Sequence, residues 1–115
     1  MRITIDIDNK RELKKVILKI NDFFNKKIID EICQSSSKRG YHIIIYDLNI
    51  TFDECMILRK IFGDDRRRLY IDSIRHRQGH ATQVLFTSKS GKRIKKVFDR
   101  KRNINKLPPT VRYLV

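Results

Sequence analysis

The chain opens on a strict alternation of apolar and polar residues. Across residues 3–8 every odd position is isoleucine, whereas Thr4, Asp6 and Asp8 occupy the even positions. Because successive side chains of a strand point to opposite faces, this alternation predicts a half-buried strand. Its isoleucines face the core, and Asp6 and Asp8 share the other face.

Two later segments carry the spacing of amphipathic helices. Apolar residues recur every three or four positions over residues 10–25, after Asn9 and Glu12 in the spacing of a capping box. A second, shorter helix is predicted after Thr51, with Glu54 in the same capping-box position and Gly63 just past the helix end.

Four further segments are rich in β-branched and aromatic residues, and they predict strands at residues 27–34, 41–46, 69–74 and 83–87. For residues 27–34 a helix is the alternative. Breaks are expected at residues 78–79 and 90–91, where a glycine follows a polar residue. The order β-α-β-β-α-β-β predicts an α+β fold with a ferredoxin-like or RRM-like β-α-β-β-α-β sheet, an extra C-terminal strand and a basic tail.

This fold predicts a single domain over residues 1–98 and a basic C-terminal extension over residues 99–115. Both helices cover one face of the sheet, and the other face is open to a ligand. Strand parity places Asp6, Asp8, His42, Tyr70 and Asp72 on that open face. We therefore expect the chemistry of the protein there.

Charge is distributed unevenly along the chain, whose net charge is +14 at pH 7. Residues 1–58 hold ten Lys or Arg and nine Asp or Glu, whereas residues 59–115 hold seventeen and four. Such an excess predicts a polyanionic partner, and nucleic acid above all. A solvated surface enriched in Lys and Arg is the alternative. The candidate nucleic-acid contacts are Arg66, Arg67, Arg68, Arg75, Arg77, Lys92 and Arg93.

No apolar stretch reaches the roughly 18 residues of a membrane span, and the first residues lack the apolar core of a signal peptide. We therefore expect a cytoplasmic protein without a membrane partner, in the host cytoplasm if the protein is viral. Cys33 and Cys55 are too few for a disulfide framework, which favours buried free thiols. His76 and His80 lack Cys or carboxylate partners, which favours solvated side chains over a zinc site.

Asp6 and Asp8 have the residue type and spacing of metal ligands. Their Cβ atoms lie about 6.5 to 7 Å apart along a strand. One Mg²⁺ or Mn²⁺ fits between the two carboxylates if Asp72 contributes from a neighbouring strand and phosphate oxygens complete the coordination. The alternative is that Asp8 caps the following helix and Asp6 is an ordinary solvated residue.

A polar loop between the second and third predicted strands contains Ser37, Lys38, Arg39 and Gly40, with His42 just beyond. Hydroxyl, backbone N–H and cationic groups of this kind bind phosphate oxygens, and glycine permits close approach of the backbone. A polar hairpin turn is the alternative. Asp64 and Asp65, which precede three arginines, likewise suit either a charged turn or a phosphate-contact loop.

Taken in order, these segments resemble the catalytic core of the archaeo-eukaryotic primase superfamily, in a minimal or reduced form. The family pattern is hydrophobic-Asp-hydrophobic-Asp, then a Ser-x-x-Gly-x-His-like segment, then an Asp after two hydrophobic residues. Residues 5–8, 37–42 and 70–72 match it in that order. The resemblance implies a catalytic metal site of Asp6, Asp8 and Asp72 holding Mg²⁺ or Mn²⁺, and a nucleoside triphosphate bound by Ser37, Lys38, Arg39 and His42.

The leading hypothesis is a primase-like domain that binds nucleic acid and nucleotides in DNA replication or repair of an archaeon or archaeal virus. If it is active, it catalyses metal-dependent nucleotidyl transfer. Two alternatives keep the fold without the chemistry: a non-catalytic nucleic-acid-binding module, and a structural or adaptor protein that forms a homodimer through its sheet. A rolling-circle replication initiator needs a His-hydrophobic-His pattern and a nucleophilic tyrosine on a helix, and neither pattern is present.

Overall fold

The structure is a computed structural model that describes residues 1–35, 38–84, 88–89, 92–93 and 95–115. Its elements in chain order are β1 (Ile3–Ile7), α1 (Lys10–Phe24), β2 (Glu31–Gln34), β3 (Tyr41–Ile45), α2 (Phe52–Phe62), α3 (Arg66–Arg77), β4 (Ser88–Lys89), β5 (Lys92–Arg93), β6 (Lys95–Asp99), β7 (Ile104–Asn105) and α4 (Pro109–Arg112). The predicted α+β class is confirmed.

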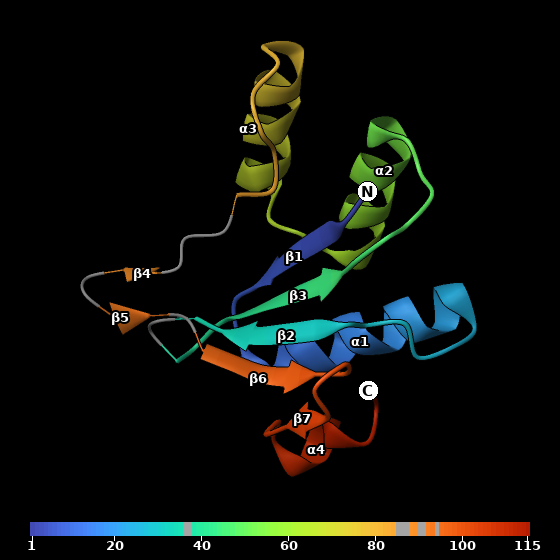
Figure 1. The fold of residues 1–115 in the computed structure, drawn as a ribbon, viewed down its shortest axis with the longest axis vertical. Helices are drawn as coiled ribbons and strands as arrows, with labels where there is room; N and C mark the ends of the chain where they lie inside the picture. The colour runs from blue at the N-terminus through green and yellow to red at the C-terminus, as the bar shows by residue number, and fades with distance from the viewer. Residues whose placement is uncertain (36–37, 85–87, 90–91, 94) are drawn as a thin grey trace.

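The main sheet has the strand order β1-β3-β2-β6-β7, with every neighbouring pair antiparallel, and β4 pairs with β5 in a separate small hairpin. In Figure 1, α1 runs behind the sheet, whereas α2 and α3 lie toward its β1 edge. Strand β3 lies between β1 and β2, so the unit β1-α1-β2 is split by a third strand.

The hydrophobic core lies between one face of this sheet and the helices α1 and α2. The isoleucines of β1 alternate into it as the sequence predicted, and each is at most 3% exposed. Apolar residues at helical spacing complete it, because each helix turns one stripe toward the sheet. These residues are Leu13, Val16, Ile17 and Ile20 from α1 and Cys55, Leu58 and Phe62 from α2.

Both predicted helices begin and end where their capping signals indicate. The Asn9 side chain accepts a hydrogen bond from the Glu12 N–H at 3.0 Å, and α1 starts at the next residue. At α2 the capping box is complete, since Thr51 and Glu54 each accept a hydrogen bond from the backbone N–H of the other. Gly63 ends α2 in the left-handed conformation, with φ at 93°.

The predicted strand at residues 69–74 is wrong, because this segment lies inside helix α3. The helix begins after Asp65, whose side chain accepts a hydrogen bond from the Arg67 N–H at 2.7 Å. Arg68 and Asp72 lie one turn apart on the same side, and both form buried or half-buried ion pairs with the turn and helix before them. These tertiary contacts outweigh the strand propensity of Leu, Tyr and Ile. The predicted order β-α-β-β-α-β therefore ends in a helix instead of a strand.

A second predicted strand, at residues 83–87, does not begin where the sequence predicts. Gln83 and Val84 are not in a strand, and residues 85–87 lie outside the described part of the chain. Gln83 instead has a left-handed backbone, with φ at 55°, and its side chain is buried against β1.

Residues 99–115, predicted as a basic extension, complete the core rather than leave it. Strand β6 crosses the predicted boundary and pairs with β7. Leu107 and Val111 are fully buried in the core, and Leu114 and Val115 pack partly against it. The domain therefore includes these residues, because apolar positions between the charges of this segment pack against α1 and the sheet.

The face of the sheet opposite the helices carries a polar row across four strands. Asp6 of β1 is the cross-strand partner of His42, which in turn pairs with Cys33, and Cys33 pairs with Lys96. Cys33 and Cys55 are both buried free thiols, as predicted. No helix in the described part of the chain is long and apolar enough to cross a membrane.

Candidate functional site

Asp6 and His42 form the centre of the predicted site on the open face. Their strands pair in register, so that His42 Nδ1 lies 3.0 Å from Asp6 Oδ1. Burial alone would raise the pKa of Asp6, but the hydrogen bond and charge of His42, together with the charge of Arg68, outweigh burial and lower it. Asp6 is therefore held as a carboxylate that already has a partner.

Asp8 follows β1 and is exposed, and it does not cap α1, because Asn9 does. With Asp6, it lines a pocket of about 210 Å³ between the end of β1, α1 and the end of α2. Glu12, Lys19 and Asp65 also line this pocket. Both residues of the Asp-x-Asp pair therefore border one pocket, in which acidic residues outnumber the single lysine.

The predicted phosphate loop lies at the same end of β1. A Cβ added to Gly40 would sit 2.7 Å from the Ile7 carbonyl oxygen, so the hairpin backbone packs directly on the end of β1. The Gly40 N–H donates to Ser35 Oγ at 3.0 Å, and the Ser35 N–H donates to the Gly40 carbonyl at 2.8 Å. Lys38 and Arg39 are exposed, and Ser37 lies outside the described residues.

Asp72 does not join Asp6 and Asp8, so the predicted convergence of three carboxylates on the open face is wrong. Asp72 lies on α3 and is buried, with Oδ2 accepting from Arg59 Nη1 at 2.8 Å and from the Gln83 N–H at 3.1 Å. The reason is the helical backbone of residues 69–74, which turns Asp72 toward α2. Among the described residues, no group of three or more His, Cys, Asp or Glu is arranged to hold a metal ion.

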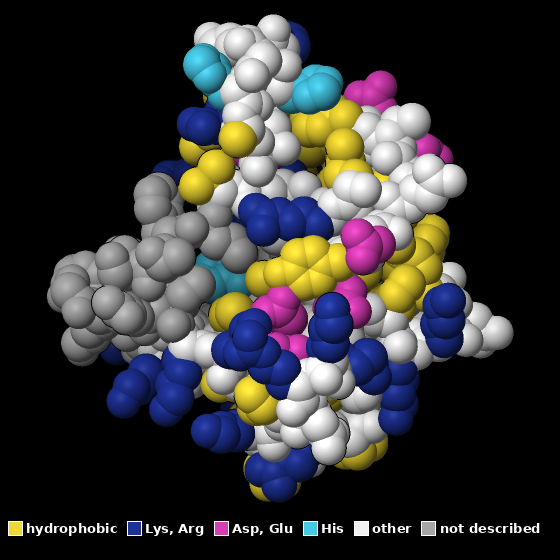
Figure 2. All heavy atoms as spheres, in the orientation of Figure 1, with side chains coloured by type: hydrophobic (Ala, Val, Ile, Leu, Met, Phe, Trp, Pro, Cys, Tyr) yellow, Lys and Arg dark blue, Asp and Glu magenta, His cyan; other side chains and the backbone are white. Residues whose placement is uncertain are grey.

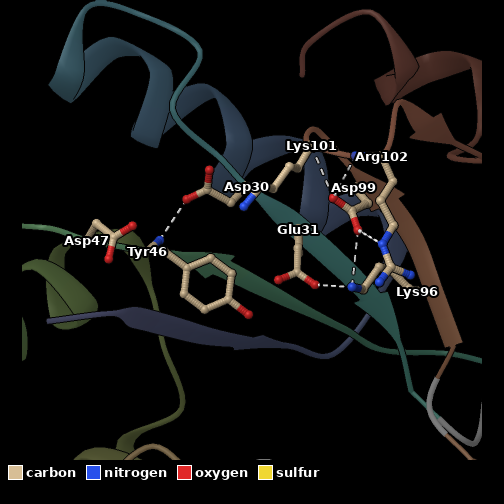
Figure 3. A pocket seen from close by; sticks show the side chains of 8 residues that line it. All are labelled: Asp30, Glu31, Tyr46, Asp47, Lys96, Asp99, Lys101 and Arg102. Carbon is tan, nitrogen blue, oxygen red and sulfur yellow. Dashed lines mark hydrogen bonds and ion pairs between the residues drawn. The ribbon is translucent and has the colours of Figure 1, made fainter.

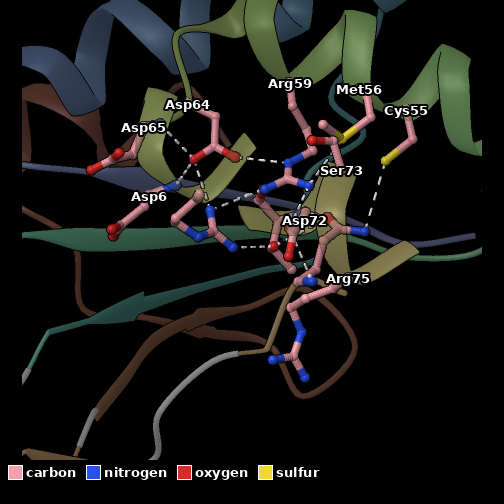
Figure 4. A network of polar contacts seen from close by, with 12 residues as sticks. Asp6, Cys55, Met56, Arg59, Asp64, Asp65, Asp72, Ser73 and Arg75 are labelled. Atoms are coloured by element: carbon pink, nitrogen blue, oxygen red, sulfur yellow. Dashed lines mark hydrogen bonds and ion pairs between the residues drawn. The ribbon is translucent and has the colours of Figure 1, made fainter. Parts of the chain in front are cut away.

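Asp72 belongs instead to a buried network along the free edge of β1, drawn in Figure 4. Arg59 is fully buried and binds Asp64 Oδ2 at 2.8 Å as well as Asp72. Asp64 Oδ1 accepts from the Asp6 N–H at 2.8 Å and from Arg68 Nη1 at 2.7 Å. The network therefore joins α2, α3 and β1 through one arginine and one carboxylate.

Gln83 continues this network in place of a neighbouring strand. Its Oε1 accepts from the Thr4 N–H, and its Nε2 donates to the Arg2 carbonyl oxygen at 2.7 Å. These are the donor and acceptor that a paired strand would supply. Sequence reasoning missed Arg59 and Gln83, although Arg59 stands four residues after Cys55 and three before Phe62, on the buried stripe of α2.

The predicted nucleic-acid contacts separate into two groups on α3. Arg68 and Arg75 face the rest of the protein, where Arg68 binds Asp64 and Thr4 and Arg75 Nε donates to the Ala81 carbonyl at 2.6 Å. Arg66, Arg67 and Arg77 are exposed. Lys92 and Arg93 form β5, and their side chains lie outside the described part of the structure.

His76 is exposed and stacks on Phe52, with ring centroids 3.7 Å apart and planes 7° from parallel. His80 is also exposed. The solvated interpretation of this His-x-x-x-His pair agrees with these positions. The Phe52–His76 stack joins the first turn of α2 to the last turn of α3, so the two helices pack antiparallel.

A second pocket, of about 390 Å³, lies on the open face at the other ends of β2 and β3 (Figure 3). Lys96 binds both Glu31 and Asp99, the latter at 3.2 Å. The hydrogen bond to Glu31, together with burial, raises the pKa of Tyr46 to about 12. Acidic and basic side chains both line this pocket, and the ion pairs of Lys96 with Glu31 and Asp99 and of Arg102 with Asp99 neutralise part of their charge.

No family model, curated protein or solved structure matches this chain. What the site does is therefore inferred from its own geometry and charge.

Proposed function

We propose that the protein is a nucleic-acid-binding domain whose principal contact surface is the exposed side of α3. The observation that carries this proposal is the position of Arg66, Arg67 and Arg77, which point to solvent while Arg68 and Asp72 anchor the opposite side of the helix. Cations held on a fixed helix bind a phosphate backbone with little loss of backbone freedom on binding.

The placement of the three arginines within the helix favours an anionic partner. Arg66 and Arg67 occupy the first turn of α3, which holds no Asp or Glu of its own, and the Asp65 carboxylate at the N-cap offsets part of the partial positive charge of this helix terminus. Cations at this end are unfavourable for the isolated helix, whereas a phosphate there is favoured. A bound polyanion relieves the part of this repulsion that the Asp65 carboxylate does not offset.

A second basic surface surrounds β6, β7 and α4. Figure 2 shows Lys and Arg side chains gathered over this part of the molecule, with acidic side chains next to them at the centre of the view. Its exposed cations are Lys95, Arg100, Lys101, Arg102, Lys106 and Arg112. Asp99 lies 3.9 Å from Arg102 and offsets part of this charge, and we therefore assign this surface a supporting role.

The test is the salt dependence of binding, measured by fluorescence anisotropy with labelled oligonucleotides. The wild type should bind, and the logarithm of its affinity should fall linearly with the logarithm of salt concentration. Replacing Arg66, Arg67 and Arg77 by Ala should flatten that slope by up to about 0.9 for each phosphate that the variant no longer neutralises.

The matched control removes the same charge from another helix. Arg11, Lys14 and Lys15 are exposed on α1, and their replacement by Ala should change the slope much less. Absence of binding at low salt, or equal effects of the two triple variants, contradicts the proposal.

A second candidate function is nucleotide binding at the end of β1, as the primase-like resemblance implies. It is favoured by the hairpin of Lys38, Arg39 and Gly40, which lies against the end of β1, the strand that contains Asp6 and that Asp8 follows. The residues present do not form the expected three-carboxylate metal site, because Asp72 is bound to Arg59. DNA replication or repair, and an archaeal or viral origin, stay predictions.

Thermal unfolding with nucleoside triphosphates tests this second function. A nucleotide at 100 times its dissociation constant stabilises the fold by about 2.7 kcal/mol, which raises the melting temperature measurably. Lys38→Ala should reduce that rise, whereas Lys26→Ala, an exposed lysine after α1, should not. No rise with any triphosphate, with or without Mn²⁺, excludes the nucleotide site. Nucleotide incorporation by the wild type would establish catalysis.

A further inference from the structure

The exposed side of α3 carries large apolar side chains as well as arginines. Tyr70 is 67% exposed and Ile71 is 51% exposed. At about 100° per residue they fall on the same half of the helix as Arg66, Arg67 and Arg77. No Asp or Glu occurs on this half of α3.

The opposite half of α3 is fixed to the body of the protein along its whole length. Arg68 binds Asp64 near the first turn, Asp72 binds Arg59 in the middle, and His76 stacks on Phe52 near the last turn. In Figure 1 the helix stands at one end of the molecule, beyond the β1 edge of the sheet. The exposed half is thus presented as a rigid ridge.

The dimensions of this ridge match a groove of duplex DNA. Its 12 residues extend about 18 Å at 1.5 Å per residue, and Arg66 and Arg77 lie about 16 Å apart along the axis. The major groove of B-form DNA is about 12 Å wide and admits an α-helix. The two arginines are therefore spaced widely enough to reach phosphates on the two sides of such a groove.

We infer that α3 enters the major groove of duplex DNA, with Tyr70 and Ile71 against the base edges and the arginines on the phosphates. This inference rests on the proposed nucleic-acid-binding function and specifies its ligand. Apolar side chains in the major groove contact the thymine methyl group. A-form RNA is a poor ligand for such a ridge, because its major groove is too narrow and deep for side chains to reach the bases.

The first experiment compares ligands for the wild-type protein by fluorescence anisotropy at one salt concentration. A DNA duplex of about two helical turns should bind at least about tenfold more tightly than the RNA duplex of the same sequence and than either single strand. A DNA duplex in which glucosylated hydroxymethylcytosine fills the major groove should bind at least about tenfold more weakly than the unmodified duplex.

The second experiment removes the apolar centre of the ridge. Tyr70→Ala and Ile71→Ala should each weaken binding to duplex DNA about fivefold or more, with the salt slope unchanged because neither side chain neutralises a phosphate. Ile57→Ala and Ile61→Ala are the matched controls, since these isoleucines are 58% and 51% exposed on neighbouring α2. Their affinities should equal that of the wild type.

The outcomes separate the inference from the function on which it rests. Equal binding of the RNA duplex, tighter binding of single strands, or indifference to the filled groove overturns the major-groove inference and leaves nucleic-acid binding intact. Unchanged affinity of Tyr70→Ala and Ile71→Ala does the same. Absence of binding to every oligonucleotide overturns both. The ligand comparison uses the unmodified protein, so it decides the question even if a variant fails to fold.

Discussion

Arg59 joins α2 to α3 through a buried ion pair. Its side chain is fully buried, and it binds the carboxylates of Asp64 and Asp72 at 2.8 Å each. Asp64 has a second cation in Arg68, whereas Arg59 is the cation that binds Asp72, which also accepts the Gln83 N–H. Removal of the guanidinium therefore leaves the buried Asp72 carboxylate without the cation that balances its charge.

Arg59→Leu should lower the free energy of unfolding by about 3 to 5 kcal/mol, the usual cost of breaking a buried ion pair from one side. Chemical denaturation followed by circular dichroism measures this change. Lys60→Ala is the control, because Lys60 is exposed on the same helix, and surface substitutions usually shift stability by at most about 0.5 kcal/mol. A loss below about 1 kcal/mol for Arg59→Leu would show that the pair contributes little.

The lowered pKa of Asp6 predicts the direction in which the free energy of unfolding changes with pH. This pKa is lowered in the folded protein, because the interactions with His42 and Arg68 outweigh burial. A carboxyl group with a lowered pKa stabilises the fold above its unfolded pKa of about 3.9 and loses that contribution as the pH falls through the folded value.

We therefore expect wild type and Asp6→Asn to differ in unfolding free energy at neutral pH and to converge as the pH falls below about 3.9. Denaturant titrations at a series of pH values measure the difference. Asp22→Asn, at an exposed position of α1, should show no such convergence. A difference between wild type and Asp6→Asn that stays constant with pH would mean that Asp6 acts through packing alone.

At the scale of single residues, strand parity correctly placed Asp6 and His42 on one face of the sheet, where they pair, but it misplaced Asp72. Parity applies only within a strand, and β1 and β3 are strands over the predicted residues. Asp72 was assigned a face by the same rule, but it lies in a helix, where side chains follow a period of 3.6 residues. Because residues 69–74 form a helix and not the predicted strand, the parity rule wrongly placed Asp72 among the metal ligands.

At the scale of elements, helices with both local capping signals and an apolar stripe were predictable, whereas α3, which has the Asp65 cap without such a stripe, was not. Thr51 with Glu54 and the following Gly63 fix the ends of α2 by contacts within a few residues. The sequence of α3 carries no apolar stripe, since Tyr70 and Ile71 point to solvent and Asp72 points inward. Helix α3 forms because ion pairs with α2 and the preceding turn stabilise it, and such long-range contacts are not visible in a hydrophobic pattern.

At the free edge of β1, the side chain of Gln83 forms the backbone hydrogen bonds that a neighbouring strand would form. Gln83→Ala should lower the unfolding free energy by about 1 to 3 kcal/mol, because the buried Thr4 N–H loses its acceptor. It should also promote aggregation, since an unpaired strand edge pairs with other chains.

Thermal unfolding and light scattering measure the two effects. Gln78→Ala is the control, because Gln78 is exposed at the end of α3. If Gln83→Ala scatters light no more than Gln78→Ala at equal concentration, other contacts protect the β1 edge.

At the scale of the whole molecule, charged residues and buried apolar residues are mixed along the chain, and they are not separated into a domain and a tail. The last residues were predicted as an extension because Lys and Arg dominate their composition. Leu107 and Val111, separated by four positions, nevertheless reach the core through the short helix α4 and the turn before it. Two buried residues in a basic segment are too few for a periodic signal, and only the fold reveals their position.

The contribution of this segment to the core leads to a last prediction. Leu107→Ala should lower the free energy of unfolding by about 2 to 5 kcal/mol, because Leu107 is fully buried and its truncation leaves a cavity. Denaturant unfolding measures this change, and Tyr113→Ala is the control, since Tyr113 is 62% exposed in the same segment. A chain ending at residue 98 should lose cooperative unfolding altogether, because it lacks both Leu107 and Val111. Cooperative unfolding of that shorter chain, with unchanged stability of Leu107→Ala, would show that residues 1–98 form the domain by themselves.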